Sequence, residues 1–297
     1  MSAEPRLLAT GLRFPEGPTL LDDGAVAVVE MRGEAVARVA ADGAVTRLGD
    51  CGGGPNGSAL GSDGAVYVAN NGGLALGPEG IVHAEREFDG RVQRVDADGT
   101  VTTVADGLPG PGPHRPNDIC FAPDGRLLVT DSANWSEPRD LKPGRLLAIA
   151  ADGAVSVLAE IEGVPNGLAF SPDDATLYLA QSMTRKILAF EVRADGGLGE
   201  PATWGKLPGG MPDGMCVGAD GALYVCGSID DSLHVFRDGE LAETFELPKN
   251  SQPTNCCLTE EGDLLVTLAK TGELIALGVG AERLPLHRGS ITNGAAA

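Results

Sequence analysis

Apolar and polar positions alternate along this chain in a plan that recurs six times. Each copy begins with a proline and continues through a polar and a small residue into a short apolar run. An acidic residue, followed by glycine in all copies but the fourth, then leads into a second apolar run; residues 211–227, MPDGMCVGADGALYVCG, show the plan. An acid-glycine pair between alternating apolar runs is typical of a β-hairpin. The copies begin at Pro15, Pro55, Pro116, Pro165, Pro212 and Pro253.

The spacing of these repeat prolines predicts the fold. The period averages about 48 residues, which is typical of a β-propeller blade made of several short strands. Five of the copies carry a second Asp-Gly pair further on, as expected for a turn between the third and fourth strands. We therefore expect an all-β fold, a six-bladed β-propeller of four-stranded antiparallel blades, in one domain that spans residues 1–297.

The two ends of the chain have separate roles in this prediction. The last copy is short of a full blade, whereas residues 6–12, RLLATGL, form a short alternating segment before the first copy. We expect residues 6–12 to supply the outer strand of the last blade, because ring closure removes exposed sheet edges. Residues 289–297 are expected to be a disordered tail.

Charge narrows the range of partners. The formal net charge is −20, with 22 Lys and Arg against 42 Asp and Glu. A nucleic acid or an anionic membrane requires a basic surface, so neither is an expected partner, whereas cation binding is compatible with this charge. No apolar run is long enough to span a membrane, and residues 1–10 lack the pattern of a signal peptide. We expect a cytoplasmic monomer or small homo-oligomer that binds a small-molecule substrate.

The six cysteines do not form a zinc or redox motif, because no two are spaced as Cys-x-x-Cys. Three of them lie four residues after a repeat proline, where the other copies have Thr or Ala. This position is therefore expected to require a small buried side chain, which favours a packing role over a reactive one. The three are Cys120, Cys216 and Cys257.

Long loops are expected to gather on one face. In a propeller, the loops after the second strands open on the face where the inner strands begin. Residues 71–90 and 132–144 are long loops of this kind, and the Pro/Gly-rich link 106–114 enters the same face. Such loops usually hold a ligand, although they can also simply shield the channel. His83 and Trp135 are candidates for the mouth, and His114 is expected to be solvated.

The candidate chemistry follows directly after each repeat proline. Because inner strands surround the central channel, these side chains should converge at its mouth: they are Glu16, Asn56, Asn117, Asn166, Asp213 and Thr254. Carboxylate and amide oxygens without Cys or His are hard ligands, which favour Ca²⁺, Mn²⁺ or Mg²⁺ over Zn²⁺. The alternative is that they only hold ordered water. The next position is Gly in four copies, which would leave room for close approach.

The repeats resemble those of the gluconolactonase and senescence-marker-protein (regucalcin-like) family. The resemblance covers all six copies and is carried by FPEGP, RPNDICFAPDGRLLVTD, VPNGLAFSPD and MPDGMCVGADGALYV. It implies a six-bladed propeller that binds one divalent metal through Glu16, Asn166 and Asp213. Related phosphotriesterases and paraoxonases have a similar calcium set that would add Asn117.

The same resemblance implies a substrate-binding motif. In the lactonases the Arg-x-Asn motif, here Arg115 and Asn117, contacts the substrate. Two positions depart from the family pattern: Gln181 stands where many members have Asp, and Trp135 or Glu137 is nearest to an acidic sugar-contacting residue. An aromatic side chain there favours a less polar ligand than a sugar.

The expected function is hydrolysis of a lactone, either a sugar lactone or a less polar one. A divalent metal, most simply Ca²⁺ and alternatively Mn²⁺, Mg²⁺ or Zn²⁺, would polarise the carbonyl, and Arg115 would stabilise the developing charge. Asp213 is the candidate general base toward water, with direct nucleophilic attack as a variant. For Arg115 the alternative is a salt bridge to Asp118 or Asp131. For the whole protein the alternatives are a phosphotriesterase-like hydrolase, a lyase or a non-enzymatic metal-binding propeller.

Overall fold

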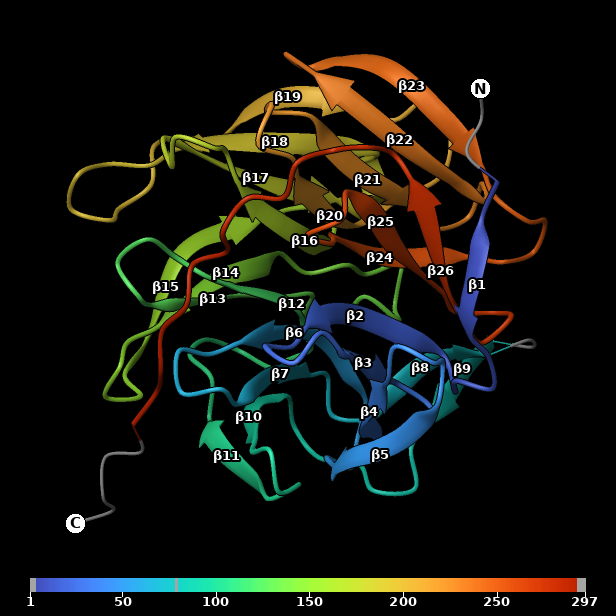
Figure 1. Cartoon of the computed structure of the whole chain (residues 1–297). Helices are drawn as coiled ribbons and strands as arrows, with labels where there is room; N and C mark the ends of the chain where they lie inside the picture. The colour runs from blue at the N-terminus through green and yellow to red at the C-terminus, as the bar shows by residue number, and fades with distance from the viewer. Residues whose placement is uncertain (1–3, 78–79, 293–297) are drawn as a thin grey trace.

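The chain forms six four-stranded antiparallel sheets. Figure 1 shows that they are arranged around a common centre. This computed structural model describes residues 4–77 and 80–292. Within those residues the only helical turn is the 3₁₀ helix η1 (Ser182–Thr184), and no helix there is long and apolar enough to cross a membrane. The fold is the expected six-bladed β-propeller.

The strands of each blade follow one another from the channel outward. The inner strands, which all begin at a repeat proline, are β2 (Pro15–Leu20), β6 (Pro55–Leu60), β12 (Pro116–Phe121), β16 (Pro165–Phe170), β20 (Pro212–Val217) and β24 (Pro253–Leu258). The second strands are β3 (Val26–Glu30), β7 (Val66–Asn70), β13 (Leu127–Asp131), β17 (Thr176–Gln181), β21 (Leu223–Gly227) and β25 (Asp263–Leu268). The third strands are β4 (Ala35–Val39), β10 (Arg91–Val95), β14 (Gly144–Ile149), β18 (Lys186–Glu191), β22 (Ser232–Arg237) and β26 (Glu273–Gly278). The outer strands are β5 (Val45–Asp50), β11 (Val101–Ala105), β15 (Val155–Ile161), β19 (Ala202–Lys206), β23 (Glu240–Glu246) and β1 (Arg6–Ala9).

The acid-glycine pairs make the turns that the sequence indicated. In the first blade the carboxylate of Asp23 accepts a hydrogen bond from the backbone N–H of Ala25, and Gly24 has a left-handed φ of +80°. Asp220 accepts from Ala222 in the same way in the fifth blade. The Asp side chain thus closes the turn, and Gly takes the backbone conformation that other residues adopt at a cost.

The N-terminal strand closes the ring. β1 pairs antiparallel with β26, so the first strand of the chain is the outer strand of the sixth blade, and Arg6 forms an ion pair of 2.7 Å with Asp263. The sixth blade therefore joins both ends of the repeat array and covers an edge that would otherwise be exposed.

The C-terminal residues that the structure describes do not form a disordered tail. Residues 282–292, here named the C-terminal strap, cross the face of the propeller opposite the repeat prolines. Ile291 is buried in the core between the second and third blades and donates its N–H to the hydroxyl of Tyr67. The expectation of disorder is thus wrong for residues 289–292, because backbone hydrogen bonds and apolar burial hold them. The rest of the expected tail, 293–297, lies outside the described residues.

Neighbouring inner strands pack very closely, and this explains the glycines after the ring position. A Cβ on Gly57 would lie 2.5 Å from the carboxylate of Asp118, and one on Gly214 would lie 2.1 Å from the amide carbon of Asn255. A Cβ on Gly167 would lie 2.4 Å from the carbonyl oxygen of Asp213. The space at these glycines is therefore filled by the next blade, and is not left for a ligand as the sequence suggested.

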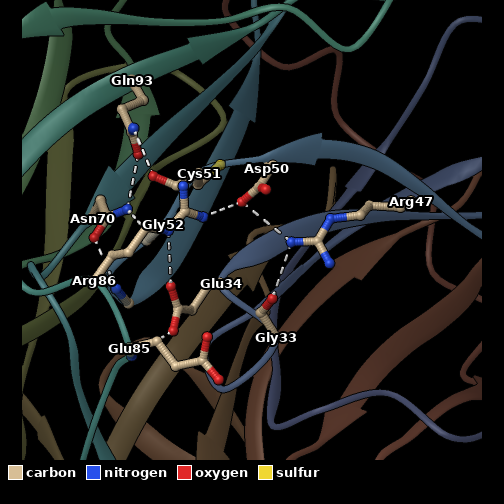
Figure 2. A network of polar contacts seen from close by, with 11 residues as sticks. Gly33, Glu34, Arg47, Asp50, Cys51, Gly52, Asn70, Glu85, Arg86 and Gln93 are labelled. Atoms are coloured by element: carbon tan, nitrogen blue, oxygen red, sulfur yellow. Dashed lines mark hydrogen bonds and ion pairs between the residues drawn. The ribbon is translucent and has the colours of Figure 1, made fainter.

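The long loop of the second blade is folded onto the first blade. Its residues form the hairpin β8 (Leu74–Gly77) and β9 (Gly80–His83). Figure 2 shows the polar network at its end, where Arg86 pairs with Asp50 and with Glu34, and Glu34 also accepts the N–H of Glu85 at 2.7 Å. This network joins the two blades and fixes the loop beside the face where inner strands begin.

Candidate metal and substrate site

The residues that follow the repeat prolines encircle one end of the channel. Each is the second residue of an inner strand, and neighbouring inner strands contact one another all round the ring. The side chains of Glu16, Asn56 and Thr254 are buried, and those of Asn117, Asn166 and Asp213 are partly exposed. The predicted ring is therefore a feature of the folded chain.

Backbone strain accompanies the entry into several of these strands. The residue before the proline has a left-handed backbone in three blades, with φ of +60° at Phe14, +66° at Val164 and +54° at Gln252. A bulky or β-branched residue adopts this conformation at a cost, so the surrounding structure must hold it. Such a bend sets the direction in which the chain enters the repeat proline, which directly precedes the residue of the ring.

Two carboxylates of the ring repel each other. Burial raises the pKa of Glu16 well above its usual value, and the negative charges of Asp213 and Asp118 raise it further. Burial likewise raises the pKa of Asp213 to about 8, with Asp118 adding to the shift and hydrogen bonds from Asn166 and Ser228 opposing it. Because like charges in a desolvated site disfavour ionisation, this end of the channel attracts a cation.

Asp118 and Asn255 bridge the channel one residue deeper than the ring. The amide Nδ2 of Asn255 donates to Oδ2 of Asp118 at 3.4 Å, although the residues are 137 positions apart in the chain. Burial raises the pKa of Asp118 to about 6. The bridge thus forms a floor beneath the ring and separates the mouth from the lower part of the channel.

The ring oxygens fit a hard divalent cation. Among the described residues, no three His, Cys, Asp or Glu side chains are grouped so that they could hold a metal ion. The candidate set therefore depends on amide oxygens from Asn117 and Asn166 in addition to the two carboxylates of Glu16 and Asp213. Carboxylates and carbonyls are ligands typical of Ca²⁺ and Mg²⁺, and a bound cation would relieve the repulsion between the acids.

Thr254 is the ring residue least suited to a ligand role. Its hydroxyl donates to the carbonyl oxygen of Pro15 at 2.9 Å and contacts the hydroxyl of Thr267 at 3.0 Å. These bonds connect the sixth blade to the first and hold the start of β2. Thr254 therefore positions Glu16, and a hydrogen bond between their side chains lowers the pKa of Glu16 somewhat against the larger effects that raise it.

Arg115 immediately precedes the repeat proline of β12, two residues before Asn117 of the ring. Its backbone N–H donates to Asp131, and Nη1 donates to the carbonyl of His114 at 3.0 Å. In the described part of the chain the guanidinium forms no ion pair, and its Nε is buried without a hydrogen-bond partner. The alternative of a side-chain salt bridge to Asp118 or Asp131 is thus not what the structure has.

His114 is buried, so the expectation of a solvated side chain is wrong. Its Nδ1 lies 2.9 Å from Oδ2 of Asp131, which also accepts from Arg145 Nη1 at 3.0 Å. The hydrogen bond to Asp131 raises the pKa of His114, and its own burial opposes that rise. This cluster is structural, and it holds the backbone that carries Arg115.

The remaining mouth candidates, Trp135 and His83, lie in the segments that follow the second strands. Trp135 is partly buried in the loop after β13, where Asn134 accepts from the N–H of Lys142 at 2.7 Å and donates to Asp140. His83 is exposed and pairs with Glu87 at 2.6 Å, and it lines a pocket of about 490 Å³ between the β8–β9 hairpin and the first blade.

The departure at Gln181 has a structural explanation. Its side-chain amide donates to the carbonyl of Glu162 at 2.6 Å. Gln181 therefore ties the end of β17 to the segment that leads into β16.

Serines that the sequence analysis overlooked position the ring. Ser132 donates to the carbonyl of Pro165 at 2.6 Å, and Ser182 donates to that of Pro212 at 2.7 Å. Each hydroxyl therefore holds the first residue of the next inner strand. The signal was present as a column of serines just after the second strands, which also includes Ser228 beside Asp213.

Comparison with known proteins decides the family. The sequence pattern of the family described as SMP-30/Gluconolactonase/LRE-like region matches residues 14–270. The chain belongs to this family.

Individual members of this family have low sequence identity to this chain. It is 25% identical over 230 residues to a gluconolactonase of Zymomonas mobilis subsp. mobilis, an alignment that covers 71% of this chain and 60% of that protein. The chain thus spans about six-tenths of the length of this curated relative.

Solved structures of similar proteins share the fold. A gluconolactonase from Xanthomonas campestris is 25% identical, with a TM-score of 0.73 over 93% of this chain and 97% of that one. A calcium-binding protein, regucalcin, from Agrobacterium tumefaciens is 22% identical, with a TM-score of 0.76 over 96% and 98%. At that identity the second likeness concerns the fold alone.

Proposed function

We propose that this SMP-30/gluconolactonase-like protein is a divalent-metal-dependent hydrolase that opens the ring of a small lactone. The observation that carries the proposal is the pair of mutually repelling carboxylates, Glu16 and Asp213, in a ring completed by amides at the channel mouth. The names of the gluconolactonase relatives support lactone chemistry. The donor set of carboxylate and amide oxygens supports Ca²⁺ as the first metal to test.

Glu16, Asn117, Asn166 and Asp213 would hold the cation. When bound, the cation would polarise the lactone carbonyl and offset the negative charge that develops as water attacks. Oxygen donors on rigid inner strands need little rearrangement to act in this way, because the ring is built before any ligand arrives.

The side chains around the ring divide the remaining tasks. Asp213 accepts the proton of the attacking water as general base, since a bound cation would lower the pKa that burial raises in the metal-free protein and keep this carboxyl ionised. The Arg115 guanidinium, whose Nε has no partner in the described chain, donates toward the developing oxyanion. Asn117 orients the substrate, and Trp135 contacts its less polar part. Direct attack by Asp213 is the variant mechanism.

The test is proton release during hydrolysis of a lactone panel that contains aldonolactones, aliphatic γ- and δ-lactones and dihydrocoumarin. The protein is first stripped with EDTA, and calcium, manganese, magnesium or zinc is then added back. We expect a metal to restore turnover in the wild type and not in Asp213→Asn. Asp220→Asn, which changes an exposed turn acid of the same blade, is the matched control and should behave as the wild type does.

The outcomes separate the candidate functions. The preferred lactone indicates whether the substrate is a sugar lactone or a less polar compound. If metal raises the melting temperature but no lactone is turned over, the lactonase proposal fails. Phosphotriesters and lyase substrates would then be assayed on the same metal-loaded protein.

A further inference from the structure

The lower half of the central channel contains a cavity apart from the candidate metal site. It has a volume of about 260 Å³, is partly open to solvent and is lined by the parts of all six inner strands that follow the ring position. Most of the wall is apolar, with Leu60, Ile119, Leu168, Met215 and Leu258 from five different blades. None of the six ring residues belongs to the wall.

The bridge between Asp118 and Asn255 closes the upper end of this cavity. Both side chains line it, and both fill the space over a glycine of the preceding blade, Gly57 and Gly214 respectively. A ligand in the lower cavity is therefore on the other side of the bridge from Glu16 and Asp213. The two sites share a wall, but their ligands enter from opposite faces.

The C-terminal strap covers the lower end. Leu284 and Leu286 are part of its lining, and Leu286 is also 59% exposed to solvent. The basic residues of the strap are engaged with carboxylates of the blades: Arg283 pairs with Glu260, His287 with Asp174 at 2.7 Å and Arg288 with Asp22 at 2.8 Å. The strap therefore supplies apolar surface to the cavity while its basic side chains are paired with acids.

The polar side chains of the wall have partners within the protein. Thr19 and Ser58 approach each other at 2.8 Å, and Ser58 also donates to the carbonyl of Gly17 at 2.7 Å. The hydroxyl of Ser171 contacts Asp173 at 2.7 Å. Water in this cavity would find few free partners, whereas an apolar molecule would gain contacts and lose little hydrogen bonding.

From these features we propose that the lower cavity is a second binding site, for a small uncharged apolar molecule, which enters when the C-terminal strap lifts. The volume exceeds the about 150 Å³ of an apolar cavity known to bind benzene, so a bicyclic or short aliphatic compound matches it. This proposal does not depend on the proposed lactonase function.

The test uses the uncharged dye N-phenyl-1-naphthylamine, whose fluorescence rises in apolar surroundings. It is titrated into the full chain in EDTA, so that the metal site plays no part, and indole is used as a competitor. We expect saturable binding of one dye per chain. In Ala59→Met/Ala169→Met, which enlarges two side chains of the wall, the affinity should fall at least about tenfold.

Two further variants locate the binding. Ile229→Ser removes an exposed apolar side chain (65% exposed) outside the cavity and should leave dye binding unchanged. Ile291→Ala weakens the anchor of the strap without touching the cavity lining, and it should accelerate dye association several-fold. Binding that is lost in Ile229→Ser, or that persists in the double Met variant, would overturn the proposal.

Thiol footprinting provides a readout on the native chain, which serves if the double Met variant does not fold. Cys120, Cys216, Cys256 and Cys257 line the cavity, whereas Cys51 is buried elsewhere. The dye should slow alkylation of the wall cysteines by N-ethylmaleimide and leave that of Cys51 unchanged, as measured by mass spectrometry. Equal slowing at all five, or at none, would contradict a site in the lower cavity.

Discussion

Replacing Asp213 by Asn should stabilise the metal-free protein and, at the same time, weaken its response to metal. In the fold, burial and the charge of Asp118 raise the pKa of this carboxyl from 3.8 to about 8. The native state therefore binds more protons than the unfolded chain between these two values. Its stability falls as the pH rises from about 4 to about 8, because the unfolded chain ionises first.

The magnitude follows from the size of the shift. Each pH unit in this window costs the metal-free protein up to about 1.4 kcal/mol, so that the upper limit at pH 7 is about 4 kcal/mol. Asp213 is partly exposed, and Asn166 and Ser228 donate hydrogen bonds to its charged form. We therefore expect Asp213→Asn to raise the free energy of unfolding by about 2 kcal/mol at pH 7 in EDTA.

The assay is urea unfolding at pH 5, 7 and 8, in EDTA and in excess calcium. Calcium at about 100 times its Kd should stabilise the wild type by about 2.7 kcal/mol and the variant by far less. Asp220→Asn is a control that should change the free energy of unfolding in the opposite direction. The hydrogen bond from Arg237 lowers the pKa of Asp220, so the charged form of this carboxyl stabilises the native state. The reasoning is refuted if metal-free Asp213→Asn is no more stable than the wild type at pH 8, or if both respond equally to calcium.

Three other substitutions test separate parts of the site. His114→Gln should destabilise the protein most at low pH, because the hydrogen bond to Asp131 raises the pKa of His114. The stabilisation that His114 provides is complete below about pH 6.5 and is lost as the pH rises through the pKa of the folded state. Urea unfolding at pH 5.5 and 8.5 measures this difference. Gly57→Ala should cost about 1–3 kcal/mol, because its Cβ would lie 2.5 Å from the Asp118 carboxylate, and thermal unfolding that is unchanged would contradict the close packing. Arg115→Lys should lower kcat of lactone hydrolysis about 100-fold with little change in melting temperature, whereas a change in KM alone would assign the guanidinium to substrate binding rather than to charge stabilisation.

The ring of acids and amides could be predicted because it repeats. Glu16 and Asp213 hold the same place relative to a repeat proline, and a propeller converts equal places in a repeat into neighbouring places around one channel. The same logic overlooked Ser132 and Ser182, although serine directly follows the second strand in the third, fourth and fifth blades, because these side chains hold the backbone and are not metal ligands.

The misplaced expectations concern residues outside the repeat pattern. His114 lies in a Pro/Gly-rich link that reads as solvated, yet Asp131 and Arg145 approach it from the blade that follows. Residues 289–292 have the composition of a tail, yet Ile291 finds a buried place between two blades. Asp131 is 17 positions from His114, and Tyr67 is 224 positions from Ile291. The composition of the local segment therefore does not indicate either contact.

The sequence by itself thus determined the number of blades, the start of each inner strand and the residue types that reach the channel mouth. These depend on short-range patterns, since apolar alternation makes strands and an acid-glycine pair makes a turn. Only the tertiary structure decided that Asp118 meets Asn255 across the channel, that Glu16 and Asp213 repel each other and that the strap covers a lower cavity. Those features arise from closure of the ring, which brings together side chains more than 100 positions apart, and their distances are set by how the blades pack.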